Sequence, residues 1–168
     1  MMYTTVEGFI KDYQGEAATT QKLLDTLTDE SLNQQVAPGY RTLGHLAWHL
    51  VHNDRGILHG AGLSFEAPSA TDEPPVSAAT IAQSYRATTE AILEAVRVQL
   101  TDAKLQENVN MFGQTWTISL TLYNYLKHEV HHRGQLTILM RQAGLAVTGA
   151  YGPAKQEWAY LGAPAPAY

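Results

Sequence analysis

Residues 125–136 read Tyr125-Leu126-Lys127-His128-Glu129-Val130-His131-His132-Arg133-Gly134-Gln135-Leu136. Within them, His128 and His132 are four positions apart, so on an α-helix they lie one turn apart on the same face. Two imidazoles in this arrangement can bind one metal ion if another part of the chain supplies a third ligand. All seven histidines of the chain fall either here or between positions 45 and 59. This clustering of the histidines indicates a functional site.

The apolar periodicity around the pair predicts a helix over residues 118–143, with Thr117 as its N-cap. When His128 is set at 0°, the core-facing side chains fall between about 20° and 80° at 100° per residue. They are Ile118, Tyr125, His132, Leu136, Leu139 and Ala143. Glu129 falls at about 100°, near the core, and His131 at about −60°, away from it. Buried neutral imidazoles need a partner, and a bound cation would satisfy the inward pair.

A second helix over residues 42–59, with Thr42 as its N-cap, carries the other four histidines. Relative to the centre of its apolar arc, His49 lies at about 120°, His45 at about 160° and His52 at about 180°. None of them points directly inward, but His49 is closest to the apolar stripe. We therefore expect His49 to be the third ligand, with His45 and His52 as the alternatives.

Two further amphipathic helices are predicted over residues 6–27 and 77–101, and Thr4 or Thr5 and Ser77 are placed to cap them. Residues 61–76 contain three prolines and form a connector long enough to cross the molecule. The second and third helices can therefore run parallel. The pattern predicts an all-α four-helix bundle with a long crossover between helices two and three.

We expect a single domain over residues 1–168, with an irregular tail at 145–168. Residues 103–116 are also expected to be irregular, with a short extended piece at 109–112. The chain has 168 residues, of which 45% are apolar and 16% charged, and its net charge is −5. This balance is typical of a globular protein and argues against nucleic acid as a partner.

The composition also limits location and chemistry. The chain has no cysteine, which excludes disulfides, thiolate ligands and a cysteine nucleophile. The first residues do not show the basic segment and apolar run expected of a secretion signal, and no run approaches the ~18 apolar residues of a membrane span. We expect a cytoplasmic protein without a membrane partner.

Three neutral histidines leave a coordination position open, which is typical of catalytic zinc sites. A water bound there can have its pKa lowered to roughly 7, and a substrate thiol could be ionised in the same way. Imidazole ligands accept several divalent ions. We expect zinc or nickel, with iron as an alternative.

Residues 128–132 also match the HExxH pattern of zinc proteases, in which the glutamate is the general base. A metalloprotease is therefore an alternative by motif. The predicted four-helix pattern argues against it, because no strand-rich subdomain offers an edge on which a peptide could be held.

Three stretches resemble the DinB-like superfamily: Thr42-Leu43-Gly44-His45-Leu46-Ala47-Trp48-His49-Leu50, then residues 128–136, then Tyr151-Gly152-Pro153 with Glu157-Trp158. The resemblance implies a four-helix bundle, often dimeric, that holds a metal with three histidines. Carried over to this chain, they are His49, His128 and His132. Relatives include thiol-dependent S-transferases and metal-dependent hydrolases, and the family name implies no DNA chemistry here.

The preferred hypothesis is a homodimeric metal enzyme that activates water for hydrolysis or the thiol of a small cofactor for S-transfer. Since the chain has no cysteine, any sulfur nucleophile must arrive as a low-molecular-weight thiol. Glu129 is the expected general base or partner of the ligands, and Arg133 the expected anchor for an anionic small-molecule substrate. The alternatives are a non-catalytic bundle that uses metal or ligand binding for dimerisation, and a protein whose histidines hold no metal.

Overall fold

The computed structural model describes residues 2–52, 55–69 and 72–167. The molecule is mostly helical, as predicted, with a small two-stranded sheet. Its elements are α1 (Val6–Leu24), η1 (Glu30–Asn33), α2 (Leu43–His52), α3 (Arg55–Gly60), α4 (Ala78–Gln99), η2 (Lys104–Gln106), β1 (Asn108–Met111), β2 (Gln114–Thr117), α5 (Ile118–Gln142) and η3 (Lys155–Leu161), where η marks a 3-10 helix.

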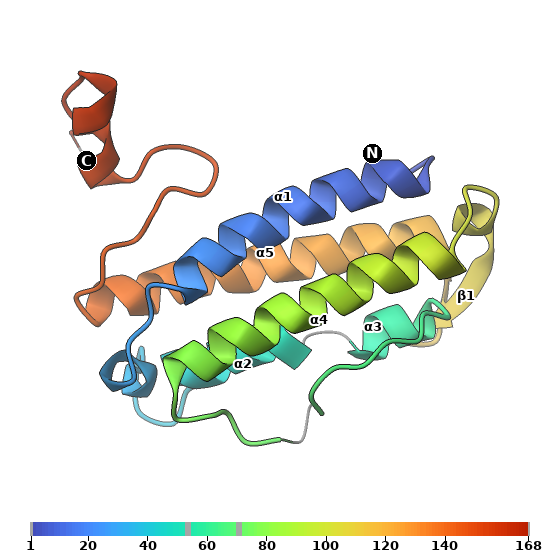
Figure 1. Ribbon diagram of the computed structural model, residues 1–168, viewed down its shortest axis with the longest axis horizontal. Coiled ribbons are helices and arrows are strands. Elements are labelled where there is room, and N and C mark those ends of the chain that lie inside the picture. The colour runs from blue at the N-terminus through green and yellow to red at the C-terminus, as the bar shows by residue number, and fades with distance from the viewer. Residues whose placement is uncertain (1, 53–54, 70–71, 168) are drawn as a thin grey trace.

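Four helices pack along one another around the core (Figure 1). α1 contacts α4 and α5, and α2 contacts the same two helices. In Figure 1, α1 and α5 run in one direction while α2 and α4 run in the other. This packing places α2 beside α5, so the two histidine-rich segments of the sequence face each other.

Each long helix begins at a cap that the sequence predicts. At these caps a side-chain hydroxyl oxygen accepts a hydrogen bond from the backbone N–H three residues on, at 3.1 to 3.4 Å. The capping residues are Thr5, Thr42, Ser77 and Thr117. Such a bond satisfies one of the N–H groups that the first helical turn leaves without a partner.

The Thr117 cap matters most for function because it begins α5, which carries two of the three inward histidines. We expect Thr117→Ala to lower the free energy of unfolding by about 1 kcal/mol, since the Leu120 N–H loses its acceptor. Urea unfolding followed by circular dichroism measures this loss. Thr117→Ser keeps the hydroxyl and is the control; an equal loss in both variants would show that the cap does not matter.

The structure corrects two details. The helix expected over 42–59 is described as α2 and α3; residues 53 and 54, which separate them, lie outside the described ranges, so its continuity stays a prediction. The all-α expectation misses a hairpin, because the extended piece at 109–112 pairs with β2 in antiparallel register. Its turn has positive φ at Phe112 (54°) and Gly113 (79°), which suits a two-residue hairpin. The tail, expected to be irregular, contains η3.

The core lies between the four packed helices and is lined by aromatic and branched side chains. Phe9 and Tyr13 of α1 stack with their ring centroids 5.6 Å apart, and Tyr13 meets Tyr125 of α5 edge to face. Within the described ranges, no helix is both long and apolar enough to cross a lipid bilayer.

Candidate metal centre

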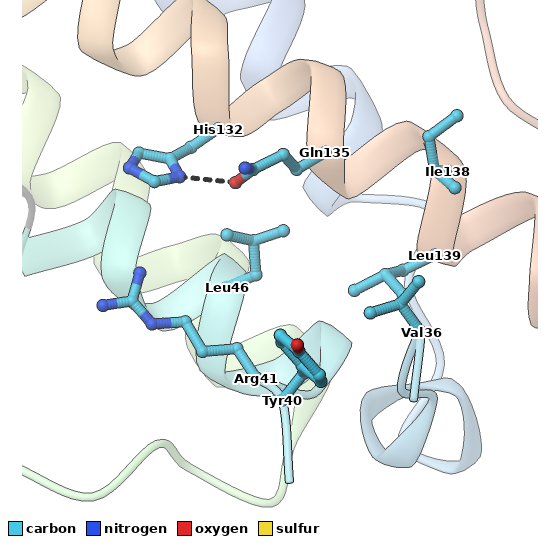
Figure 2. Close-up of a pocket in the computed structure, with 8 residues that line it drawn as sticks. All are labelled: Val36, Tyr40, Arg41, Leu46, His132, Gln135, Ile138 and Leu139. Carbon is cyan, nitrogen blue, oxygen red and sulfur yellow. Dashed lines mark hydrogen bonds between the residues drawn. The ribbon is translucent and has the colours of Figure 1, made fainter. Parts of the chain in front are cut away.

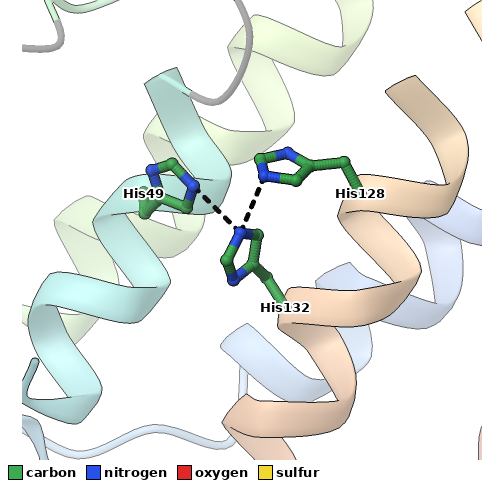
Figure 3. Close-up of side chains that lie close together, drawn as sticks. All are labelled: His49, His128 and His132. Atoms are coloured by element: carbon green, nitrogen blue, oxygen red, sulfur yellow. Dashed lines mark hydrogen bonds between the residues drawn. The ribbon is translucent and has the colours of Figure 1, made fainter. Parts of the chain in front are cut away.

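Three histidine rings converge between α2 and α5 (Figure 3). The Nε2 atom of His132 lies 3.2 Å from that of His49 and 2.9 Å from that of His128. One nitrogen from each ring can be chosen so that all three lie within 4.8 Å of one another. The rings meet nearly at right angles, with interplanar angles of 84° to 87°.

The donor set and its spacing fit a divalent ion. Metal–nitrogen bonds of 2.0–2.1 Å in a tetrahedral site place two ligand nitrogens about 3.3 Å apart. The two Nε2 separations at His132 differ from this by a few tenths of an ångström. A neutral imidazole ring offers one hydrogen-bond donor and one acceptor. Hydrogen bonds among the three rings can therefore pair only some of the nitrogens that converge here. A cation at their centre would use all three lone pairs.

Burial keeps these rings uncharged at neutral pH, as metal ligands must be. Burial, together with the neighbouring His132 and Arg41, lowers the pKa of His49 to about 3. The pKa values of His128 and His132 are also lowered, mainly by burial. The lone pairs therefore stay available.

The remaining histidines lie in other environments. The His45 ring is exposed, and its Nδ1 forms a hydrogen bond with the Thr42 hydroxyl at 2.7 Å. His52 packs edge-on against Trp48 and His49, and the Nδ1 of His59 lies 2.6 Å from a backbone carbonyl oxygen, that of Leu63. Of the three third-ligand candidates, the structure brings only His49 into the group with His128 and His132.

A model of the DinB family matches residues 2–166. The chain belongs to the DinB family. It is 46% identical over 165 residues to YrdA of Bacillus subtilis (strain 168), an uncharacterised protein, and the match covers 98% of this chain and 99% of that one.

Solved structures agree with this membership. A DinB-like protein from Bacillus cereus ATCC 10987 is 47% identical and superposes with a TM-score of 0.86, over 89% of this chain and 100% of that chain. The DinB-like protein YjoA from Bacillus subtilis shares the fold with a TM-score of 0.67 at 18% identity, over 88% and 99% of the two chains. The resemblance seen in the sequence is confirmed.

Gln135, which the sequence analysis did not single out, fixes the orientation of His132 in this DinB-family chain. The Nδ1–H of His132 donates to the side-chain carbonyl oxygen of Gln135 at 2.8 Å. The amide nitrogen of Gln135 lies 3.1 Å from the Nε2 of His131, to which it donates. With its proton on Nδ1, His132 presents the Nε2 lone pair toward His49 and His128. The feature of the sequence that could have revealed this contact is the i, i+3 spacing of His132 and Gln135 on one helix.

We expect Gln135→Ala to weaken metal binding about 10-fold to 100-fold, because the His132 ring loses the partner that fixes its tautomer. Competition with a chromogenic chelator measures the affinity. Gln142→Ala removes an exposed glutamine from the same helix and is the matched control. Equal affinities of the Gln135 variant and the control would show that Gln135 does not orient the ligand.

Glu129 lies on α5 but faces the interior, where it is only 1% exposed. Its Oε1 accepts hydrogen bonds from the Thr20 hydroxyl at 2.7 Å and from the Tyr85 hydroxyl at 2.5 Å. Burial raises its pKa, while these two hydrogen bonds and the nearby Arg133 lower it. These contacts tie α5 to α1 and α4. The role of general base therefore stays a prediction, and the described contacts of Glu129 favour a structural one.

Arg133 is equally buried, at 2% exposed. Its Nη2 donates to the Glu16 carboxylate at 2.5 Å and to the Tyr151 hydroxyl at 2.7 Å, and its Nη1 donates to the Glu16 carbonyl oxygen at 3.0 Å. The guanidinium thus joins α1, α5 and the tail. Its predicted role as a substrate anchor has not been tested, and these contacts leave it little capacity for a ligand.

A pocket of about 520 Å³ opens beside His132 (Figure 2). Its volume is typical of small-molecule sites, which span roughly 300–1,000 Å³. The described lining residues are Val36, Tyr40, Arg41, Leu46, His132, Gln135, Ile138 and Leu139. The histidine group is thus next to a space that a substrate could occupy.

Proposed function

We propose that this DinB-family protein is a divalent-metal-dependent enzyme whose ion is held by His49, His128 and His132. The observation that carries the proposal is the convergence of three histidine nitrogens beside a pocket. A four-helix bundle with a long crossover between its two parallel helices would provide the frame. The open side of the three-nitrogen set would be available to a reactant, as in catalytic sites.

A bound divalent ion would supply Lewis acidity, making a proton easier to remove from water or from a small-molecule thiol. The chain's own contribution is orientation: Gln135 holds the ring of His132, and the pocket holds the substrate against it. The reaction would be hydrolysis or thiol-dependent S-transfer. Zinc or nickel is the preferred ion, and iron is also compatible with imidazole ligands.

Glu129 and Arg133, which the sequence suggested as catalytic residues, would act indirectly. Glu129 would hold α5 in place through Thr20 and Tyr85, and so set the positions of the ligands that flank it. Arg133 would do the same through α1 and the tail. We further propose that the protein works as a homodimer on a small-molecule substrate.

A non-catalytic role is the second candidate, and the apolar rim of the pocket favours it. Tyr40 is 67% exposed and Ile138 is 53% exposed at this rim. Such a surface could bind a ligand or a second copy without turnover.

Elemental analysis of the untagged protein, purified without chelators, tests the proposal. We expect about one zinc or nickel ion per chain, as a single three-histidine site requires. The metal-loaded protein should then show activity in screens for thiol transfer to electrophiles or for ester and amide hydrolysis, and chelation should remove it. Absence of any bound metal would contradict the proposal; bound metal without turnover would favour the non-catalytic role.

A further inference from the structure

The pocket beside His132 has a polar end and an apolar end (Figure 2). His132, Gln135 and the Arg41 guanidinium lie at the polar end. Val36, Ile138 and Leu139 lie at the other. The two ends therefore offer different interactions to one bound molecule.

Arg41 is an unpaired cation in the described part of the chain. Across residues 2–52, 55–69 and 72–167, its guanidinium forms no hydrogen bond or ion pair that meets ordinary distance limits. By contrast, both Nη atoms of the buried Arg133 donate hydrogen bonds, to Glu16, Thr20 and Tyr151. A free guanidinium offers planar paired donors, which match a carboxylate.

The charge at the polar end is positive. The three histidines are neutral ligands, so a bound divalent ion would keep its full charge, and Arg41 adds one more. None of the described residues that line the pocket is acidic. Such a positive field favours anionic ligands. The apolar wall on the opposite side reduces the screening of this field.

The apolar end of the pocket is open to solvent. Val36 is 58% exposed, and Ile138 and the Tyr40 ring are also largely accessible around the opening. Covering these side chains removes apolar surface from water. A ligand with an apolar body would do so while its charged group stays at the other end.

We propose that this pocket binds a small amphipathic monoanion, with its carboxylate on Arg41 and its apolar body against Val36, Ile138 and Leu139. The inference deepens the proposed function, on which it rests, by giving the class of the substrate. It assigns Arg41, rather than the buried Arg133, as the residue that binds the anionic group.

Isothermal titration of the zinc-loaded protein with sodium octanoate and with 1-octanol tests this assignment. Both probes have the same chain length, but only octanoate is charged. We expect octanoate to bind more tightly, and Arg41→Gln to weaken it about tenfold, as the loss of a charge-assisted contact implies, while octanol is little changed. Ile138→Asn should weaken both probes. Arg86→Gln makes the same charge change at an exposed arginine that pairs with Asp25, and should change neither.

Failure of octanoate to bind, or equal weakening of both probes by Arg41→Gln, would overturn the inference. Neither result bears on the proposed metal site, because the measured zinc content tests that site independently. If the protein binds no zinc, the same titration of the protein as purified still tests Arg41: a charge-dependent loss of octanoate supports the pocket assignment, and its absence overturns it.

Discussion

Replacing His132 by alanine should reduce the metal content from about one ion per chain to almost none, because a three-nitrogen site cannot hold its ion with one central ligand missing. Its Nε2 lies 3.2 Å from the Nε2 of His49 and 2.9 Å from that of His128. His128→Ala and His49→Ala should have the same effect. Plasma mass spectrometry after dialysis against dilute zinc measures the content, and circular dichroism checks that each variant is folded.

His45→Ala and His52→Ala are the controls, and they also separate the candidates for the third ligand. Both variants should keep the full metal content, since neither ring belongs to the converging group. The choice of His49 would be wrong if His49→Ala kept its metal while one of these variants lost it. Full metal content in the His128 and His132 variants would rule out the site itself.

Arg133→Met is expected to lower the free energy of unfolding by about 1.5–3 kcal/mol, the usual contribution of a hydrogen bond to a charged group, because Arg133 is buried while its partner Glu16 is only partly buried. The change leaves the Glu16 carboxylate and the Tyr151 hydroxyl without their common donor. It also removes the cation that lowers the pKa of the buried Glu129. Since small domains are stable by only about 5–15 kcal/mol, the loss should be conspicuous in urea unfolding of the metal-free protein.

Arg86→Met provides the comparison, because Arg86 also pairs with a carboxylate but on the surface. Its nitrogen lies 3.4 Å from Asp25, with both side chains about half exposed. Such pairs contribute about 0–1 kcal/mol. Similar losses in the two variants would show that the Arg133 network does not stabilise the fold. A normal unfolding curve with altered substrate binding in Arg133→Met would instead restore its predicted role as an anchor.

Local features of the sequence predicted much of the fold and the histidine group. Helix caps depend on a few neighbouring residues, and the helical period alone separates the inward His128 and His132 from His131. The contacts that depend on distant segments were harder to predict from the sequence. The pairing of His49 with α5 was only the best of three choices, because its position on the edge of an apolar stripe did not settle how α2 is rotated.

The residues missed by sequence reasoning have weak local signals. Arg41 precedes α2 and has no periodic pattern that would relate it to His132, 91 positions away. The partners of Glu129 and Arg133 come from α1, α4 and the tail, so their buried hydrogen bonds could not be foreseen from α5. The β-hairpin depends on pairing two four-residue segments, for which short-range preferences are weak.

The separation of His49 and His132 along the chain has a consequence for folding. They are 83 residues apart, so an ion held as proposed would close a long loop in a protein that has no cysteine. Closing such a loop reduces the conformational freedom of the unfolded chain, as a disulfide does. Unlike the effect of a disulfide, the stabilisation from this cross-link would increase with the concentration of the free ion. The lifetime of the folded protein, and its resistance to proteases, would then depend on metal supply.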